Sequence, residues 1–337
     1  MTKWAADPLG EGFEQQTLTL SADALATLVR YSDRHHRLDR GDLAAGADVL
    51  YVHGWSDYFF QRELADFWHR AGAAFYALDL RNYGRSLRPG LAPGQTLSLS
   101  TYDEDISAAL SAMGRTGNND RPLILLGHST GGLTLSLWAA RNPGVASAII
   151  LNSPWLEFQA NEFGRRVLTP FLVAGARRHP LAPLPQVDQG FYSRTISAAY
   201  GGEWDYNEEW RPPRGFPVTE AFLSAVLAGQ ATVERGLNID CPVLVLLSDK
   251  SYLRPRWSEI ASRSDVAIDV DIVAHRALSL GTTVTVTRVP DAIHDVFLSP
   301  PPVREKAYAA ITSWLGGYRP TTRHISWVER TFDDLTF

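Results

Sequence analysis

Short, almost wholly apolar runs recur along the chain and constrain its fold more than any other feature. The runs occupy residues 49–52, 75–80, 123–126, 148–151 and 243–247. A strand that is apolar at nearly every position is buried on both faces, as in a parallel sheet covered by helices. Helical periodicity fills several of the intervening segments, notably residues 101–113 and 131–141. The sequence therefore predicts an α/β fold with a mostly parallel central sheet flanked by helices.

Four further segments complete the predicted elements. They are residues 14–20, 24–31, 284–289 and 303–315. The first two alternate apolar and polar positions and predict a half-buried hairpin, whereas the third predicts a last strand and the fourth a last helix. Thr101 and Glu104 have the spacing of a capping box, so we expect Thr101 to cap the helix that follows it.

The alternation of strands and helices stops between Trp155 and Leu237. This stretch of 83 residues contains twelve aromatic residues and seven prolines. We expect a core formed by residues 1–154 and 238–337, and a helical cap formed by residues 155–237. Eight aromatic side chains of the cap offer rigid apolar surface for a ligand, although packing against the core would account for them equally well. They are Trp155, Phe158, Phe163, Phe171, Phe191, Tyr192, Trp204 and Trp210.

Composition and charge exclude several classes of protein. The 337 residues are 45% hydrophobic and 20% charged, with a net charge of −5, which excludes wholesale disorder and argues against a nucleic-acid-binding protein. The single cysteine, Cys241, cannot form an intrachain disulfide. Residues 1–12 lack a signal-peptide core, and no apolar run approaches the length of about 18 residues that spans a membrane. We therefore expect a cytoplasmic protein without a transmembrane segment.

A G-x-S-x-G motif lies at the end of one apolar run. Gly127-His-Ser129-Thr-Gly131 follows the run at 123–126 and leads into the helical stretch at 131–141. A serine between a buried strand and a helix takes a sharp turn, which flanking glycines permit. The turn exposes the hydroxyl at the carboxyl edge of the sheet, next to helix amides that favour negative charge. Ser129 is therefore the candidate nucleophile.

A serine nucleophile needs a base, and the base needs a group that orients it. His294 is the best placed of the nine histidines because it lies in the loop after the last predicted strand. His128 adjoins Ser129, but we expect it to point away from the site and to serve packing. Two aspartates are candidates for the orienting acid. Asp249 lies two residues after a predicted strand, and Asp265 precedes His294 by 29 residues.

Two backbone amides are candidates for an oxyanion hole. The strand at 49–52 is followed by His53-Gly54-Trp55, so the amide of Trp55 can point into the same crevice as the amide of Thr130. Two amides aimed at one oxygen would stabilise the charge that develops in acyl transfer.

Taken in order, these motifs resemble the α/β-hydrolase superfamily. The resemblance is to its monoacylglycerol lipase and lysophospholipase-like branch, also described as serine aminopeptidase S33-like. It spans residues 14–315, with residues 155–237 in the place of the variable cap of the family. The motifs that carry it are His53-Gly54, Asp79-Leu-Arg-Asn-Tyr-Gly-Arg-Ser86, Gly127-His-Ser-Thr-Gly-Gly132 and His294.

The resemblance implies a role for each candidate residue. It implies Ser129 as the nucleophile, His294 as the general base and Asp265 as the acid. It also implies the amides of Trp55 and Thr130 as the oxyanion hole.

One departure from the family concerns the acid. Residues 248–264 form an extra segment between the strand and Asp265. Asp249 therefore stays the alternative to Asp265.

The activity implied by the resemblance is that of a serine hydrolase acting on carboxylic esters. We expect a monoacylglycerol, a lysophospholipid or a similar small lipid-like ester with an apolar acyl group, and no metal ion or organic cofactor. The same residues serve thioesterases, acyltransferases and carbon–carbon bond hydrolases, and the fold also serves as a non-catalytic small-molecule receptor. The sequence does not indicate an oligomeric state. A transient contact with a membrane surface is suggested only by four arginines of the cap, namely Arg165, Arg166, Arg177 and Arg178.

Overall fold

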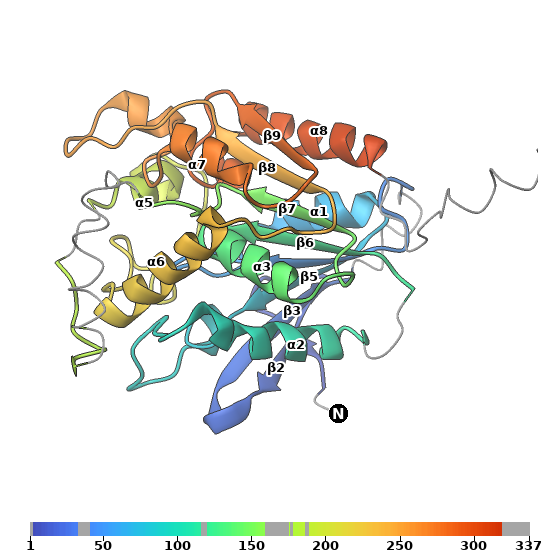
Figure 1. The fold of residues 1–337 in the computed structure, drawn as a ribbon, viewed down its shortest axis with the longest axis horizontal. Helices are drawn as coiled ribbons and strands as arrows, with labels where there is room; N and C mark the ends of the chain where they lie inside the picture. The colour runs from blue at the N-terminus through green and yellow to red at the C-terminus, as the bar shows by residue number, and fades with distance from the viewer. Residues whose placement is uncertain are drawn as a thin grey trace, which may run out of the picture.

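A nine-stranded sheet runs through the protein, with helices on both of its faces (Figure 1). The computed structural model describes residues 3–32, 41–115, 120–158, 175, 178–185 and 189–318. The strands are β1 (Ala5–Ala6), β2 (Phe13–Thr19), β3 (Leu25–Tyr31), β4 (Asp48–Val52), β5 (Ala74–Asp79), β6 (Leu123–His128), β7 (Ala148–Asn152), β8 (Val243–Ser248) and β9 (Val284–Val289). The helices are α1 (Arg62–Arg70), α2 (Tyr102–Ala112), α3 (Thr130–Arg141), α5 (Phe191–Ile196), α6 (Glu220–Glu234), α7 (Val270–Ala277) and α8 (Pro301–Gly317).

The order of the strands is β1-β2-β3-β5-β4-β6-β7-β8-β9. Six strands pair in parallel, namely β5, β4, β6, β7, β8 and β9. At one edge of the sheet, β1, β2 and β3 pair antiparallel, and β3 also pairs antiparallel with β5. Each predicted strand is present, and the N-terminal hairpin consists of β2 and β3. The predicted α/β fold with a mostly parallel sheet is therefore confirmed.

The alternation of side chains along β4 explains why the predicted strands are apolar throughout. Val49 and Tyr51 belong to the core cluster shared with α1 and α8, whereas Leu50 and Val52 belong to the cluster shared with α2, α3, α6 and α7. All four side chains are fully buried. Burial of a side chain of this kind contributes roughly 1.5–3 kcal/mol, so apolar residues stabilise the strand on both faces.

The predicted capping box does not form at the start of α2. Thr101 has helical backbone angles (φ −58°, ψ −33°) and its side chain makes no capping hydrogen bond, because the 3₁₀ turn Leu99–Thr101 leads directly into the helix. The Glu104 carboxylate instead accepts hydrogen bonds from the amide and hydroxyl of Ser21 and from Arg81. The Glu104 carboxylate, which the local spacing predicted to take part in the capping box of α2, therefore binds residues that are distant in the sequence.

The segment expected to form the cap contains helices and no named strand in the parts that the structure describes. Its helix α6 packs against α3 of the core. No helix among the described residues has the length and apolar character that crossing a membrane requires. Several residues singled out in the sequence lie outside the described ranges, namely Phe163, Phe171, Arg165, Arg166 and Arg177.

Candidate active site

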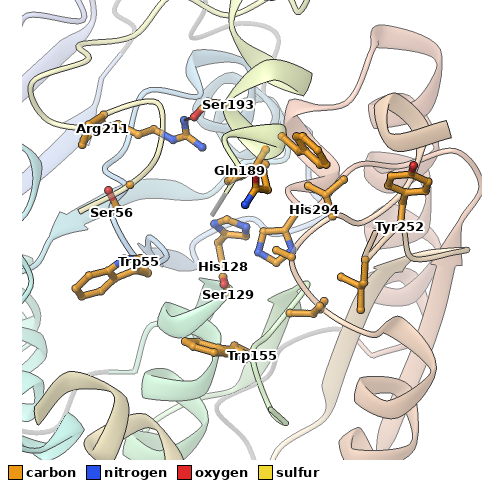
Figure 2. Close-up of a pocket in the computed structure, with 18 of the residues that line it drawn as sticks. Trp55, Ser56, His128, Ser129, Trp155, Gln189, Ser193, Arg211, Tyr252 and His294 are labelled. Carbon is orange, nitrogen blue, oxygen red and sulfur yellow. Dashed lines mark hydrogen bonds between the residues drawn. The ribbon is translucent and has the colours of Figure 1, made fainter. Parts of the chain in front are cut away.

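The candidate residues lie near one edge of the sheet, where the parallel strands end. Ser129 directly follows β6, and Trp55 lies three residues after β4. His294 lies in the loop after β9, and Asp265 lies between β8 and α7. Figure 2 shows Ser129, His128 and His294 close together at the centre of a pocket, with Trp55 and Trp155 on its walls.

Ser129 occupies a strained turn between β6 and α3. Its backbone angles are φ 50° and ψ −115°, a region that residues with side chains rarely adopt. The turn lies so close to the end of β4 that a Cβ atom on Gly131 would stand 2.3 Å from the carbonyl oxygen of His53. A Cβ atom on Gly127 would stand 2.7 Å from the Cα atom of Gly132. Glycine is therefore required on both sides of the serine.

His294 and Asp265 are hydrogen-bonded to each other. The distance from His294 Nδ1 to Asp265 Oδ2 is 2.9 Å, and both residues are buried. The other carboxylate oxygen of Asp265 accepts hydrogen bonds from the amides of Ala267 (2.8 Å) and Ile268 (2.9 Å). These two bonds hold the carboxylate in one orientation toward the imidazole.

The structure does not bring the alternative acid, Asp249, to His294. One oxygen of Asp249 accepts a hydrogen bond from the amide of Asp291, and its carboxylate lies 3.4 Å from the Lys250 ammonium. The Asp249 side chain is about a third exposed. Of the two aspartates, only Asp265 contacts the histidine.

The amides of Trp55 and Thr130 are free to bind a ligand. Within the described part of the chain, neither donates a hydrogen bond to another backbone or side-chain group. Thr130 is the first residue of α3, so its amide lies at the positive end of the helix dipole. Trp55 lines the same cavity as Ser129, and Thr130 is the next residue after Ser129.

The cavity that contains Ser129 and His294 has a volume of about 570 Å³ and a lining of both polar and apolar residues. Ser56, Ser193 and Arg211 form one polar part of the lining. The apolar residues Leu253, Pro255, Val266, Ala267 and Ile268 form another part, together with Arg254. In Figure 2, Ser56, Ser193 and Arg211 lie on one side of His128, and Tyr252 lies on the other. A substrate that reaches Ser129 would therefore contact two unlike surfaces at once.

The aromatic residues of the expected cap divide into two groups. Trp155, Phe191 and Tyr192 line the cavity, and the Tyr192 ring meets the His294 ring edge to face, with centroids 5.2 Å apart. Trp204 instead donates a hydrogen bond to the Leu298 carbonyl (3.0 Å), and Trp210 packs edge to face on Tyr58. The last two serve packing against the core, which the sequence could not distinguish from ligand contact.

The expectation that His128 points away from the site is wrong. His128 lines the cavity, and its ring centroid lies 5.0 Å from that of His294. Its Nδ1 atom lies 3.5 Å from Asp57 Oδ2 and 3.9 Å from Asp295 Oδ2. Burial alone would lower the pKa of His128, but the carboxylates of Asp295 and Asp57 outweigh it and raise the pKa above the ordinary value. These carboxylates therefore favour the charged form of the imidazole.

A buried ion pair that sequence reasoning missed completes the polar part of the lining. Arg211 Nε donates to Asp57 Oδ1 (3.1 Å), and Arg211 Nη1 donates to the Ser193 hydroxyl (3.1 Å). The guanidinium lies 4.6 Å from the ring centroid of Tyr192 and 4.9 Å from that of Tyr206. Burial would raise the pKa of Asp57, but Arg211 and His128 outweigh it and lower the pKa. No local motif could reveal this pair, because its members are 154 positions apart.

Asp295 fixes the loop that carries His294. Its carboxylate accepts hydrogen bonds from Asn152 Nδ2 (2.6 Å) and Gln61 Nε2 (3.1 Å), so the end of β7 and the start of α1 both hold it. Asn152 Oδ1 accepts in turn from the Val296 amide (3.1 Å).

No group of three or more His, Cys, Asp or Glu side chains suited to a metal ion occurs among the described residues.

Comparisons with known proteins find related sequences. A family model described as "Serine aminopeptidase, S33" matches residues 44–256. The monoacylglycerol lipase of Mycolicibacterium smegmatis is 28% identical over 276 residues, which cover 79% of this chain and 87% of that protein. Phospholipase YtpA of Bacillus subtilis is 31% identical over 147 residues, which cover 43% of this chain and 52% of that protein.

A solved structure extends the likeness of fold to nearly the whole chain. The soluble variant of monoglyceride lipase from Saccharomyces cerevisiae matches with a TM-score of 0.65 at 15% identity, covering 94% of this chain and 99% of that chain. The match at such low identity concerns the fold alone. Because the family model covers more than half of the sequence, this chain belongs to the serine aminopeptidase S33 family of α/β-hydrolases.

Proposed function

We propose that this carboxylic ester hydrolase cleaves a monoacylglycerol, a lysophospholipid or a similar small lipid-like ester, with Ser129 as its nucleophile. The observation that carries the proposal is the 2.9 Å hydrogen bond between His294 and Asp265 in the cavity that Ser129 lines. A serine hydroxyl is a weak nucleophile until a positioned base removes its proton, and the base works only in one tautomer. Asp265 accepts from Nδ1–H and so leaves Nε2 of His294 free to act as that base.

In the proposed reaction, His294 removes the proton of Ser129 as the serine oxygen attacks the ester carbonyl. The carbonyl oxygen becomes negatively charged, and the amides of Trp55 and Thr130 donate hydrogen bonds to it. The carbon–oxygen bond to the alcohol then breaks, and His294 gives its proton to the departing alcohol. A water molecule, deprotonated by His294, attacks the acyl-enzyme and releases the carboxylic acid and the serine. Removing one oxyanion donor from such a site typically costs about 10²–10³-fold in rate.

The polar and apolar parts of the cavity lining support a substrate with one apolar and one polar part. The acyl chain would lie against the apolar wall that includes Leu253 and Ile268, and the alcohol against the polar part that includes Arg211. The names of two relatives, a monoacylglycerol lipase and a phospholipase, describe substrates of this kind. A lipid ester with one long acyl chain therefore suits the cavity.

We also propose that residues 155–237 form the cap over the active site, as the sequence suggests. Contacts between this segment and the core support it. Besides the Arg211–Asp57 ion pair, the amide of Asn207 donates to the Tyr58 hydroxyl (2.7 Å), and the amide of Phe216 donates to the Ser56 hydroxyl (2.9 Å). The cap would thus be anchored on the loop that follows β4, which also carries Trp55.

Hydrolysis of a panel of esters, from acetates to long-chain monoacylglycerols, tests the proposal. Ser129→Ala should abolish turnover and labelling by a fluorophosphonate probe while the melting temperature stays close to that of the wild type. Ser107→Ala, an exposed serine on α2, is the matched control and should keep full activity. Turnover by Ser129→Ala at the wild-type rate, or a wild-type protein that hydrolyses none of the esters, would refute the proposal.

A further inference from the structure

The extra segment between β8 and α7 folds into a closed loop, residues 251–265, which is visible as the orange loop above α5 in Figure 1. A parallel bridge joins Ser251 to Asp265. The Tyr252 amide donates to the Asp265 carbonyl (2.7 Å), and the Asp265 amide donates to the Lys250 carbonyl (2.9 Å). A surface loop of this length whose ends meet is an Ω-loop, a compact unit that frequently carries function.

Contacts within the 251–265 loop and with α5 hold it in one conformation. The Tyr252 hydroxyl donates to the Arg256 carbonyl (2.7 Å). The Trp257 ring meets the Phe191 ring edge to face, with centroids 5.5 Å apart. The Arg194 guanidinium lies 4.0 Å from the centroid of the Trp257 ring. The loop therefore presents a defined outer surface.

That outer surface is both apolar and basic. Two large apolar side chains of the loop are exposed, Leu253 at 46% and Ile260 at 47%. The loop also carries three exposed arginines against two acidic residues, the exposed Glu259 and the buried Asp265, in a chain with a net charge of −5. Within the described part of the chain, none of these arginines makes a salt bridge, and Arg263 interacts with the Asp291 carboxylate only at longer range. The three arginines are Arg254, Arg256 and Arg263.

The same loop forms part of the wall of the candidate active site. Tyr252, Leu253, Arg254 and Pro255 line the cavity that contains Ser129 and His294. Its exposed apolar and basic side chains therefore lie beside the cavity, and a surface that contacts them would lie against the cavity wall.

We propose that the 251–265 loop binds an anionic lipid surface and holds the cavity against it. The inference rests on the proposed function in one respect, because a lipid surface would supply the lipid substrate that we propose. Apolar side chains of the loop enter the boundary between head groups and acyl chains, and arginines pair with head-group phosphates. The combination of two exposed aliphatic side chains with exposed arginines matches an anionic membrane better than a neutral one.

Cosedimentation with lipid vesicles tests the inference without turnover, because the binding measurements use a Ser129→Ala background. Binding is compared between vesicles of phosphatidylcholine and vesicles of phosphatidylcholine and phosphatidylglycerol in equal parts. An arginine near an anionic surface contributes about 1 kcal/mol, or roughly a fivefold change in partitioning. Arg256→Gln combined with Arg263→Gln should therefore weaken binding to the anionic vesicles by about 25-fold. Ile260→Ser should weaken it as well.

A matched pair of arginines outside the loop provides the control. Arg88→Gln combined with Arg235→Gln removes the same charge from two other exposed positions and should leave vesicle binding within about twofold. With Ser129 intact, the Arg256→Gln and Arg263→Gln double variant should hydrolyse a water-soluble acetate at the wild-type rate, because neither residue lines the cavity.

The inference is overturned by equal binding to both kinds of vesicle, by no binding to either, or by equal losses in the two double variants. These outcomes are distinct from failure of the proposed function, which is an absence of ester hydrolysis by the intact enzyme in solution.

Discussion

Replacing Asp265 by asparagine would test the proposed triad most sharply, because the surrounding hydrogen bonds dictate how the new side chain must lie. In the wild type, one oxygen of Asp265 accepts from the amides of Ala267 and Ile268, and the other faces Nδ1 of His294. Only an oxygen can accept from the two amides. The asparagine oxygen should therefore take that position, and its NH₂ group should face the imidazole.

An NH₂ group at this position forces His294 into the wrong tautomer. Nδ1 must then accept a hydrogen bond, so Nε2 carries the proton and cannot remove one from Ser129. An aspartate-to-asparagine change of this kind lowers kcat by about 10⁴-fold, which corresponds to about 5.4 kcal/mol in the activation barrier. Because asparagine has nearly the shape of aspartate, the loss should come without a large change in melting temperature.

The assay is steady-state hydrolysis of one water-soluble ester by Asp265→Asn and by the control Asp249→Asn, with the melting temperature of each variant recorded. Asp249 contacts Lys250 and Asp291 at the surface, so its replacement should change kcat by no more than about twofold. A folded Asp265→Asn variant that keeps more than about a tenth of the wild-type kcat would refute the tautomer argument. A larger loss in Asp249→Asn would make Asp249 the acid.

Three other predictions concern packing, substrate length and pH. Gly131→Ala should lower the melting temperature sharply, because its Cβ atom would meet a backbone carbonyl at 2.3 Å, whereas Gly316→Ala in α8 meets nothing within 4 Å and should stabilise by roughly 0.5–1 kcal/mol. Trp155→Ala should slow hydrolysis of long-chain esters more than of acetates, whereas Trp204→Ala, outside the cavity, should affect both alike in the same assay. The raised pKa of His128 means that its charged form stabilises the fold fully below the unfolded value of 6.5, and that this stabilisation is lost as the pH rises through the folded value. The unfolding free energy of the wild type relative to His128→Gln should fall over that interval, and a difference independent of pH would contradict the assignment.

The sheet could be predicted from the sequence because a strand buried on both faces is a run of consecutive apolar residues. The strands β4, β5, β6, β7 and β8 coincide with the short apolar runs, and the partly buried β9 occupies the predicted residues 284–289. The Ser129 turn could be predicted equally well, because a serine between glycines at the junction of a strand and a helix is typical of a nucleophile turn. In both cases the information lies within ten or so consecutive residues.

The features that the sequence did not reveal depend on partners far away along the chain. Thr101 does not cap α2, because a 3₁₀ turn leads directly into the helix, and the Glu104 carboxylate is engaged by Ser21 and Arg81. His128 lines the cavity and lies beside Asp57 and Asp295, which come from distant parts of the chain. Both predictions used only neighbouring residues in the sequence. The contacts that contradict them join segments that are distant in the sequence.

The proposed acid is distant from β8 along the chain but close to it in space. Asp265 lies 17 residues after the end of β8, yet the bridge between Ser251 and Asp265 returns the chain to a point three residues after the strand. Closing a longer loop costs little, since each doubling of its length adds only about 0.6 kcal/mol of entropy. The residues between β8 and Asp265 therefore need not displace the acid from His294. Besides forming part of the cavity wall, they could present their exposed arginines and aliphatic side chains to a lipid surface.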